Sequence, residues 1–402
     1  MDEDFIRRLR ADTPGVREVA HFNHSGASLP SVQTLDTIIE HLRLEAAWGP
    51  MEAAARVSGR IEEVRLSAAR LVGARPDEIA FLTSGSAAWG AAYSALPPMK
   101  TGDRVLVGRQ EWGGNLATLY ATAARAGVRI ETIPVGVDGG TDAVALANLI
   151  DERVKLISLT WLPANGGLIN DAAAIGKIAR AADIPYFIDA GQALGHIPVD
   201  VNELGCDVLK GAGRKFLRGP RGTAILYVRR GFQERLRPTW LDVSSAPIDQ
   251  TGAVVRSDAG KFETSEKSVA LLLGLGVAID QANDLGTDWI SGRILPMAAR
   301  LRQELENLPG VEVQDLGTRR SGIVSFTIDG KTGGQIRDEL GGLGINIGAN
   351  GVPYTPLDMK ARGLDQIARA SVSYLNTDGE IDLLVQHVAK IKHNPSRSGR
   401  IP

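Results

Sequence analysis

Seven short apolar segments, separated by stretches of helical periodicity, are the feature that most constrains the fold of this chain. The segments are Ile79–Thr83, Arg104–Val107, Arg129–Val135, Lys155–Leu162, Pro185–Asp189, Asp207–Leu209 and Thr223–Val228. The helical stretches between them are Ala87–Ala95, Asn115–Ala126, Thr141–Ile150 and Asp171–Ala182. Regular alternation of strand and helix is typical of a doubly wound α/β fold. We therefore predict one mostly parallel sheet covered by helices.

A smaller α+β unit is predicted to follow this sheet. The segment Arg237–Gly260 has little periodicity and is rich in Pro, Ser, Asp and Gly, so we expect a long connection there. The helices expected elsewhere are Val32–Ala47, Met51–Val72, Val269–Asn283, Ile290–Leu308, Gly334–Leu343 and Asp378–Ile391, with strands at Val311–Val313 and Gly322–Ile328. We divide the chain into an N-terminal arm on the small domain (1–20), a large α/β domain (21–260), a small C-terminal domain (261–392) and a disordered tail (393–402).

Composition argues against several classes of partner. The chain has 45 basic and 47 acidic residues, a net charge of −2 and no block of like charges, which gives no footprint for nucleic acid or an anionic membrane. The most apolar run, Val269–Ile279, is far shorter than the ~20 residues of a membrane span, and Met1–Gly15 has no apolar leader. We expect a cytoplasmic protein that binds neither nucleic acid nor membrane.

Cysteine and histidine usage argues against a metal site. Cys206 is the only cysteine, so the chain has neither an internal disulfide nor a multi-thiolate metal site, and we expect a buried structural thiol. The six histidines show no H-E-x-x-H spacing.

The first candidate binding element is Thr83–Ala87, which directly follows a predicted strand and opens a helix. Small residues there leave backbone N–H groups accessible at the positive end of the helix, which suits a phosphate. It lacks the dinucleotide and P-loop fingerprints, and a plain turn with a helix cap explains it about as well.

The second candidate is Asp189, at the end of a predicted buried strand. A carboxylate in that place is costly unless a cation or a hydrogen-bond donor pairs with it, which favours a functional role. The alternative is an Asp that caps the next helix.

The third candidate is Lys215, in the glycine-rich segment Gly211–Gly222 with Arg214, Arg218 and Arg221. Neighbouring positive charge and desolvation favour its free amine, which is the nucleophile of Schiff-base chemistry. The alternative is a solvated basic loop.

These three candidates lie at strand ends of one predicted sheet, where ligands bind in open α/β folds. A phosphate anchor, an acid for the ring nitrogen and a lysine are the groups that pyridoxal 5'-phosphate requires. The agreement of all three makes this cofactor the favoured hypothesis.

The sequence also resembles a known family, the class V aminotransferase and cysteine desulfurase group of fold-type I pyridoxal-phosphate enzymes. The resemblance runs from about Phe22 to Val388. The segments that carry it are Ile188–Gln192 with His196–Asp200, Gly213–Gly222 and Arg369–Thr377. It implies a large domain with a mostly parallel seven-stranded sheet, a smaller C-terminal α+β domain and a homodimer.

The resemblance also implies roles for residues around the cofactor ring. Lys215 would hold the cofactor as the catalytic residue, Asp189 would pair with the ring nitrogen, and Gln192 would bond to the phenolic oxygen. Trp112 stands where the family usually has a histidine stacked on the ring. An indole stacks as well but is neither acid nor base.

For the phosphate, the resemblance implies contacts from Gly85, Ser86 and the amide of Ala87. Before the lysine the family often has Ser-x-His, and we expect Arg214 to replace those contacts by its charge.

For the substrate, Arg369 matches the arginine that binds the α-carboxylate, a bidentate task that suits guanidinium. His24 and Ser25 match an N-terminal segment that touches substrate, although a structural role for His24 is as well supported. Thr264 and Ser265 are weaker candidates for a phosphate contact across a dimer interface.

The residues leave the reaction open. We expect a class V aminotransferase type of enzyme that acts at Cα of a small α-amino acid. The alternatives are a C–S lyase that works by β-elimination or an epimerase of the same family, and more distantly an anion- or nucleotide-binding α/β protein without the cofactor. Because Gly344–Gln366 contains no cysteine to accept sulfur, we expect the protein not to be a persulfide-forming cysteine desulfurase.

Overall fold

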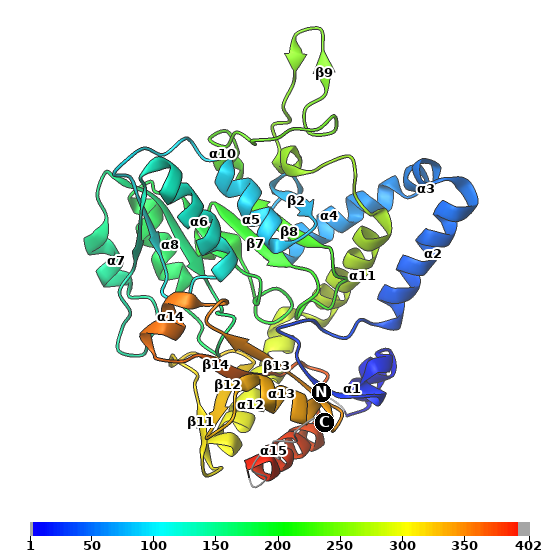
Figure 1. Ribbon diagram of the computed structural model, residues 1–402. Helices are drawn as coiled ribbons and strands as arrows, with labels where there is room; N and C mark the ends of the chain where they lie inside the picture. Colours follow the sequence, from blue (N-terminus) through cyan, green and yellow to red (C-terminus); the bar gives the residue numbers. More distant parts are fainter. Residues whose placement is uncertain (1–2, 393–402) are drawn as a thin grey trace, which may run out of the picture.

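The computed structural model describes residues 3–392, and its larger part is built on a seven-stranded sheet (Figure 1). The strands run in the order β2-β8-β7-β6-β5-β3-β4. Their bounds are β2 Ile79–Leu82, β3 Arg104–Val107, β4 Arg129–Thr132, β5 Val154–Thr160, β6 Tyr186–Asp189, β7 Val208–Ala212 and β8 Ala224–Val228. β8 pairs antiparallel with both of its neighbours, β2 and β7, and all other pairs of neighbouring strands are parallel. The predicted mostly parallel seven-stranded sheet is therefore confirmed.

Most of this sheet is buried on both faces, which explains apolar strands such as β8 (Ala-Ile-Leu-Tyr-Val), whereas the edge strand β4 (Arg-Ile-Glu-Thr) is partly exposed. The helices between the strands are α5 Gly85–Ser94, α6 Gly113–Ala126, α7 Ala143–Leu149, α8 Ala172–Ala181, α9 Val201–Leu204 and α10 Arg230–Gln233. Successive residues of β6 point to opposite faces, so that Phe187 lies in one apolar core and Ile188 in the other. Asp142 and Asp171 cap α7 and α8 through their side chains.

A group of longer helices packs beside the sheet: α2 Val32–Trp48, α3 Pro50–Arg56, α4 Ser58–Val72 and α11 Val269–Leu285. The single helix predicted over 51–72 is interrupted at Val57, which has φ −111° and ψ 13°. α11 packs very closely against α2 and α4. A Cβ on Gly274 would lie only 2.6 Å from Ile38 Cγ1, and a Cβ on Gly276 only 2.4 Å from Val64 Cγ2. The domain boundaries stay a prediction. α11 lies in the range predicted for the small domain, but it packs against two helices of the large domain.

The smaller unit is a five-stranded sheet in the order β1-β13-β14-β12-β11. Its strands are β1 Ala20–Phe22, β11 Val311–Val313, β12 Ile323–Ile328, β13 Ile345–Gly351 and β14 Gln366–Ser371, and its helices are α12 Thr287–Glu306, α13 Gly333–Gly341 and α15 Asp378–Lys392. β1, from the N-terminal part of the chain, pairs in parallel with β13. The N-terminal helix α1 (Glu3–Ala11) is tied to this unit because Arg10 donates to the Leu375 carbonyl at 2.5 Å and pairs with Glu380 at 2.8 Å.

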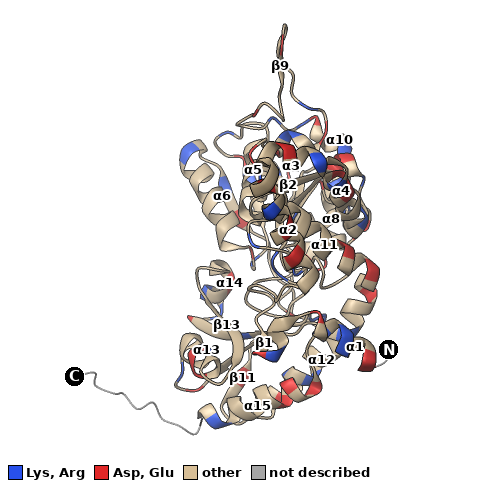
Figure 2. Cartoon of the chain, turned by 90° about the vertical axis from the view of Figure 1, so that its right-hand side faces the viewer, with Lys and Arg blue, Asp and Glu red and all other residues tan. Residues whose placement is uncertain are grey.

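The long connection at 237–260 carries a short hairpin, β9 Ile248–Asp249 with β10 Gly252–Ala253, which stands clear of the rest of the molecule (Figures 1 and 2). A short helix, α14 Pro356–Ala361, precedes β14, and 3₁₀ turns lie at Pro14–Arg17, Pro76–Glu78 and Ala259–Phe262. No single described helix has the length and apolarity to cross a membrane, although α11 and α12 together, bent by 81°, meet those two criteria. The predicted disordered tail lies outside the described residues.

Candidate active site

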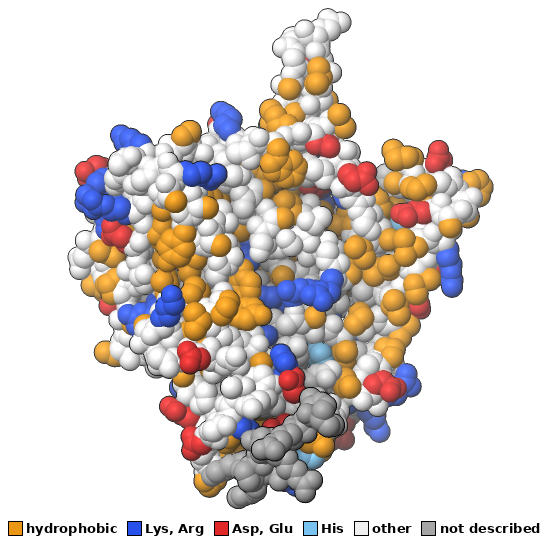
Figure 3. All heavy atoms as spheres, in the orientation of Figure 1, with side chains coloured by type: hydrophobic (Ala, Val, Ile, Leu, Met, Phe, Trp, Pro, Cys, Tyr) orange, Lys and Arg blue, Asp and Glu red, His pale blue; other side chains and the backbone are white. Residues whose placement is uncertain are grey.

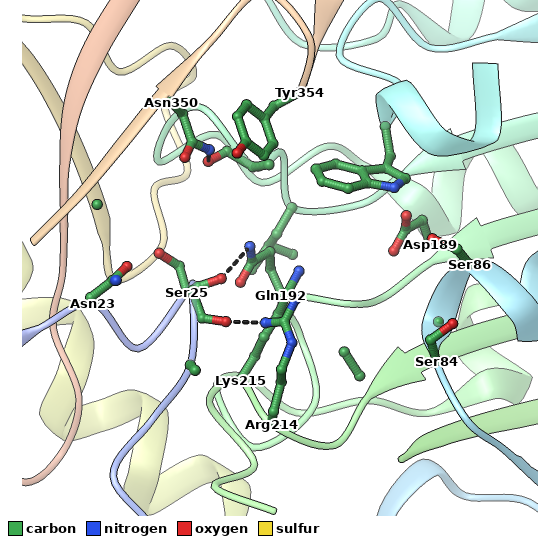
Figure 4. A pocket seen from close by; sticks show the side chains of 18 of the residues that line it. Asn23, Ser25, Ser84, Ser86, Asp189, Gln192, Arg214, Lys215, Asn350 and Tyr354 are labelled. Carbon is green, nitrogen blue, oxygen red and sulfur yellow. Dashed lines mark hydrogen bonds between the residues drawn. The ribbon is translucent and has the colours of Figure 1, made fainter. Parts of the chain in front are cut away.

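A cavity of about 620 Å³ lies between the C-terminal ends of β5, β6 and β7, the start of α5, and strands β13 and β14 of the smaller sheet (Figure 4). Its described lining contains one acidic side chain, Asp189, and six basic ones, Lys210, Arg214, Lys215, Arg221, Arg337 and Arg369. Basic side chains also gather across the middle of the face in Figure 3, between the upper and lower parts of the molecule. This excess of positive charge suits a ligand with several anionic groups.

Asp189 is buried at the end of β6 and makes three charge-assisted contacts. Its Oδ1 accepts the Gly191 N–H at 2.9 Å, and its Oδ2 accepts the Asn115 amide at 3.2 Å and lies 2.7 Å from Lys210 Nζ. A Cβ on Gly191 would lie 2.9 Å from Asp189 Oδ1, so glycine is needed there. The carboxylate is therefore paired within the chain, as a buried charge must be.

Lys215 follows β7 in a loop that turns back at Arg218, a non-glycine residue with φ 65°. Its Nζ lies 5.8 Å from the centre of the Trp112 ring. Burial, and next the charge of Lys210, lower the pKa of Lys215 to about 7, while Asp189 acts in the opposite direction. A lysine with this pKa is in part a free amine at neutral pH, which is the nucleophilic form.

The start of α5 lies on the cavity wall through Ser84, Gly85 and Ser86. Gly85 and Ser86 stand in the first turn, where backbone N–H groups have no acceptor within the helix. The Ala87 amide is used differently from the expectation: it donates to the Ser84 side chain at 3.1 Å, and Ala87 lines a neighbouring cavity. The contact of the Ala87 amide with a phosphate stays a prediction.

Arg214 lines the cavity, but its Nη1 donates to the carbonyl of Gly26 in the N-terminal segment. Burial lowers its pKa. Its contact with a phosphate stays a prediction.

Trp112 and Gln192 line the same cavity. The Trp112 ring lies 5.6 Å from the ring of Tyr354, and its backbone N–H donates to Thr160 Oγ1 at 2.9 Å. The Gln192 amide nitrogen donates to the Ser25 carbonyl at 3.1 Å. Gln192 Oε1 is buried without a partner, so a ligand group belongs next to it.

Arg369 reaches this cavity from β14, more than 150 residues beyond Lys215 in the chain. Its Nη1 donates to the Ala164 carbonyl at 2.7 Å, and its buried Nε has no partner. Burial lowers its pKa to about 10, so the guanidinium is charged at neutral pH. No carboxylate is paired with it among the described residues, which leaves a cation free to bind an anion.

The structure does not bring His24 to the cavity wall. Its Nδ1 lies 3.0 Å from Ser28 Oγ and its Nε2 2.9 Å from the His21 carbonyl oxygen, so both ring nitrogens are used within the N-terminal segment. Its neighbours Asn23 and Ser25 line the cavity instead. These contacts support the structural role that was the alternative for His24, and its contact with substrate stays a prediction.

Thr264 and Ser265 are also outside this cavity. Thr264 lines the neighbouring cavity beside Ala87, and Ser265 Oγ donates to Asp242 at 2.9 Å. Their contact across a dimer interface stays a prediction.

Sequence reasoning missed a buried network behind Asp189. Glu111 accepts the Asn115 amide at 2.7 Å and the Thr160 hydroxyl at 3.0 Å, and Asn115 also donates to Asp189. Burial raises the pKa of Glu111 to about 7. Lys210 was missed as well, although a lysine inside the apolar strand β7 is itself a signal.

These groups fit pyridoxal phosphate on observations of this chain. The cavity holds a lysine of lowered pKa, a carboxylate with a free acceptor position, an unpartnered Gln192 oxygen and a helix start made of small residues. The family model described as Aminotransferase class-V matches residues 22–384.

The chain belongs to the class V aminotransferase family. Enzymes of this family depend on pyridoxal phosphate, so the cofactor and the fold-type I architecture are those that the sequence predicted.

Relatives of this class V protein carry the name of a different reaction. This chain is 27% identical over 390 residues to a probable cysteine desulfurase of Methanothermobacter thermautotrophicus. The match covers 95% of this chain and 97% of the relative. The fold is shared with an apo cysteine desulfurase of Thermococcus onnurineus NA1 (TM-score 0.89, 23% identity, 96% and 98% covered). It is also shared with the cystine C-S lyase C-DES in complex with its product cysteine persulfide (TM-score 0.85, 23% identity, 94% and 99% covered).

These relatives overturn one prediction. The expectation that the protein is not a persulfide-forming cysteine desulfurase is wrong, because the proteins that it resembles over nearly its whole length are desulfurases and a persulfide-producing lyase. The absence of cysteine from 344–366 concerns only one way of accepting sulfur. It says nothing about cleavage of a C–S bond or about where a persulfide forms.

Cys206 does not line the cavity. It is fully buried just before β7, and burial followed by the charge of Asp207 raises the pKa of its thiol. The expected buried structural thiol agrees with this position.

Proposed function

We propose that this class V enzyme cleaves the C–S bond of a cysteine-type α-amino acid. The observation that carries the proposal is one cavity that holds both Lys215, with a pKa near 7, and Arg369, a buried cation with a free Nε. The names of the full-length relatives support sulfur as the leaving atom.

Arg369 is the group that would bind the substrate carboxylate. Its Nη1 is held by the Ala164 carbonyl, which fixes the guanidinium plane before a ligand arrives. A carboxylate bound there would point the rest of the amino acid toward Lys215 and Trp112 on the opposite wall.

Lys215 is the group that would hold the cofactor and, when its amine is free, would remove the proton from Cα. Bound pyridoxal phosphate supplies the electron sink for the bond that breaks there. A base with a pKa near the working pH combines the right protonation state with enough driving force. The Trp112 indole cannot replace it in proton transfer.

The reaction that we propose is a β-elimination in which the C–S bond breaks and its electron pair leaves with sulfur. With one water consumed in the release of ammonia, cystine would give pyruvate, ammonia and cysteine persulfide, and cysteine would give pyruvate, ammonia and sulfide. The basic side chains of Arg221 and Arg337 on the cavity wall support cystine, whose far end carries a second carboxylate.

The test is product analysis of the loaded enzyme with cysteine, cystine and sulfur-free serine, each with and without a 2-oxo acid acceptor. We expect sulfide or persulfide together with pyruvate from a sulfur amino acid, without any acceptor. A 2-oxo acid that forms only with an acceptor, and no released sulfur, would make the protein an aminotransferase. Inversion at Cα alone would make it an epimerase.

We also propose a homodimer. Large apolar side chains are exposed on α2 and α3 and on the hairpin, among them Leu42, Trp48, Met51 and Ile248. An exposed apolar surface of this kind is typical of an interaction site. Sedimentation of the purified protein would give the mass of a dimer, and the mass of one chain would refute this state.

A further inference from the structure

The cavity contains a second buried lysine, Lys210, to which neither the family resemblance nor the proposed function assigns a role. It stands in the middle of β7, and its Nζ lies 2.7 Å from Asp189 Oδ2. The same ammonium would lie 3.1 Å from a Cβ on Gly85, at the start of α5. Lys210 thus lies between the carboxylate and the helix start.

We propose that Lys210 is a positioning residue: it holds the Asp189 side chain aimed into the cavity and, by sharing this carboxylate, lowers the proton affinity of the cofactor's ring nitrogen. The inference rests on the cofactor and on Asp189 as its ring partner. It does not depend on which amino acid is the substrate.

The first argument is a count of acceptor positions on Asp189. A carboxylate offers about four lone-pair positions. Gly191 takes one on Oδ1, and Asn115 and Lys210 take two on Oδ2. A proton on the ring nitrogen must use the position left on Oδ1 or displace the Lys210 ammonium.

The second argument is charge. Lys210 and Lys215 approach Asp189 from the same region, since their Nζ atoms would lie 3.6 Å and 3.5 Å from a Cβ on Gly191. Two lysines therefore lie near one carboxylate in a buried place, one of them ion-paired with it, where like charges repel strongly. A protonated ring nitrogen would add another positive charge, so Lys210 disfavours that proton.

A lower proton affinity of the ring nitrogen also affects which reaction is favoured. A ring nitrogen that holds its proton less firmly is a weaker electron sink, so negative charge at Cα is less stabilised. Fast loss of a leaving group from Cβ is then favoured over the slower proton transfers that transamination and epimerisation need. This preference agrees with the proposed C–S cleavage.

The test compares three variants loaded with pyridoxal phosphate that carries nitrogen-15 in its ring. Lys210→Met removes the charge and keeps the length, and Lys210→Arg keeps the charge. Lys261→Met is the matched control, because Lys261 is equally buried but donates to the Gln233 and Leu236 carbonyls outside this cavity. Thermal unfolding checks that each variant folds.

We expect the nitrogen-15 resonance of Lys210→Met to move toward that of a protonated pyridine, and those of Lys210→Arg and Lys261→Met to stay near the wild-type value. An unchanged resonance in Lys210→Met would overturn the proposal. So would an equal shift in the Lys261 control.

A second measurement needs no cofactor. In the cofactor-free protein, the pH dependence of Lys215 acylation, followed by mass spectrometry, reports its pKa. Loss of the neighbouring charge in Lys210→Met should raise the midpoint by about one pH unit, and an unchanged midpoint would contradict the shared carboxylate.

These outcomes are separate from those of the proposed function. A wild-type protein that binds the labelled cofactor but releases no sulfur from cysteine or cystine refutes C–S cleavage and leaves the role of Lys210 to be decided by the resonance.

Discussion

The two walls of the cavity differ in how their charges are paired. On the large-sheet wall, Asp189 is bound by Gly191, Asn115 and Lys210, so its charge is compensated within the chain. On the small-sheet wall, Arg369 is held only by the Ala164 carbonyl and a long 3.5 Å contact to Asn23, and its Nε has no partner.

This difference assigns the walls to different ligands. A wall whose charges are already paired and fixed is pre-organised for a group that stays bound, because little rearrangement is needed on binding. A buried cation without a carboxylate is suited to an anion that comes and goes. The comparison therefore predicts that changes on the large-sheet wall alter the cofactor, whereas changes at Arg369 alter substrate binding alone.

Lys215→Ala should give the largest effect on the first wall. Loss of both the covalent anchor and the base should lower kcat by roughly 10³- to 10⁴-fold. Borohydride reduction followed by mass spectrometry should find the cofactor attached at residue 215 in the wild type and nowhere in the variant.

Lys215→Arg is the matched control, because it keeps the charge and removes the nucleophilic amine. It should be as inactive as Lys215→Ala. A variant at this position that still carries reducible cofactor would remove Lys215 from the centre of the site.

The large sheet was predictable from sequence because its strands obey a local rule. Strands buried on both faces are expected to be apolar throughout, and β8, with the sequence Ala-Ile-Leu-Tyr-Val, is. β13, Ile-Asn-Ile-Gly-Ala-Asn-Gly, and β14, Gln-Ile-Ala-Arg-Ala-Ser, have weak strand propensity. They pair with each other and with β1 and β12, which lie far away in the chain, so no local pattern reveals them.

The residues of the site also divide into those that a local sequence pattern predicts and those that it does not. Asp189 and Lys215 follow strands of the large sheet, so their meeting at one sheet edge could be argued from the sequence. Arg369 was placed only by family resemblance. Glu111 and Asn115 were not predicted, because the Asn115 amide joins Glu111 to Asp189 only through the tertiary packing of α6, which no local pattern reveals.

Arg369→Ala should affect the second wall alone. Loss of a charge-assisted pair to the substrate carboxylate should raise KM by about 10- to 100-fold. Cofactor content should stay as in the wild type, because no hydrogen bond or ion pair among the described residues joins Arg369 to Asp189 or Lys215, and the charge of Arg369 has only a small influence on the pKa of Lys215.

Arg369→Lys keeps the charge but loses the planar fork, so it should recover only part of the affinity. Loss of cofactor from either Arg369 variant would show that the two walls are not independent.

Glu111→Gln should give the smallest effect, and one that is seen in stability. The pKa of Glu111 is raised to about 7 in the folded protein, mainly by burial, whereas an unfolded glutamate titrates near its ordinary value of about 4.3. Between these two values the folded chain binds more protons than the unfolded chain, so this group makes the free energy of unfolding fall as pH rises. From pH 5 to pH 7 the fall should be about 2 kcal/mol.

Glutamine removes that titration and keeps an oxygen for the Asn115 amide to donate to. Urea unfolding of the cofactor-free proteins should therefore find that the stability of Glu111→Gln relative to the wild type increases by about 2 kcal/mol from pH 5 to pH 7. Gln192→Ala is a suitable control, because glutamine does not titrate and the stability difference of this variant from the wild type should be the same at both pH values. If the wild type and Glu111→Gln differ by the same amount at both pH values, Glu111 is ionised throughout, and the large-sheet wall then holds two buried carboxylates where the structure indicates one carboxylate backed by a neutral acid.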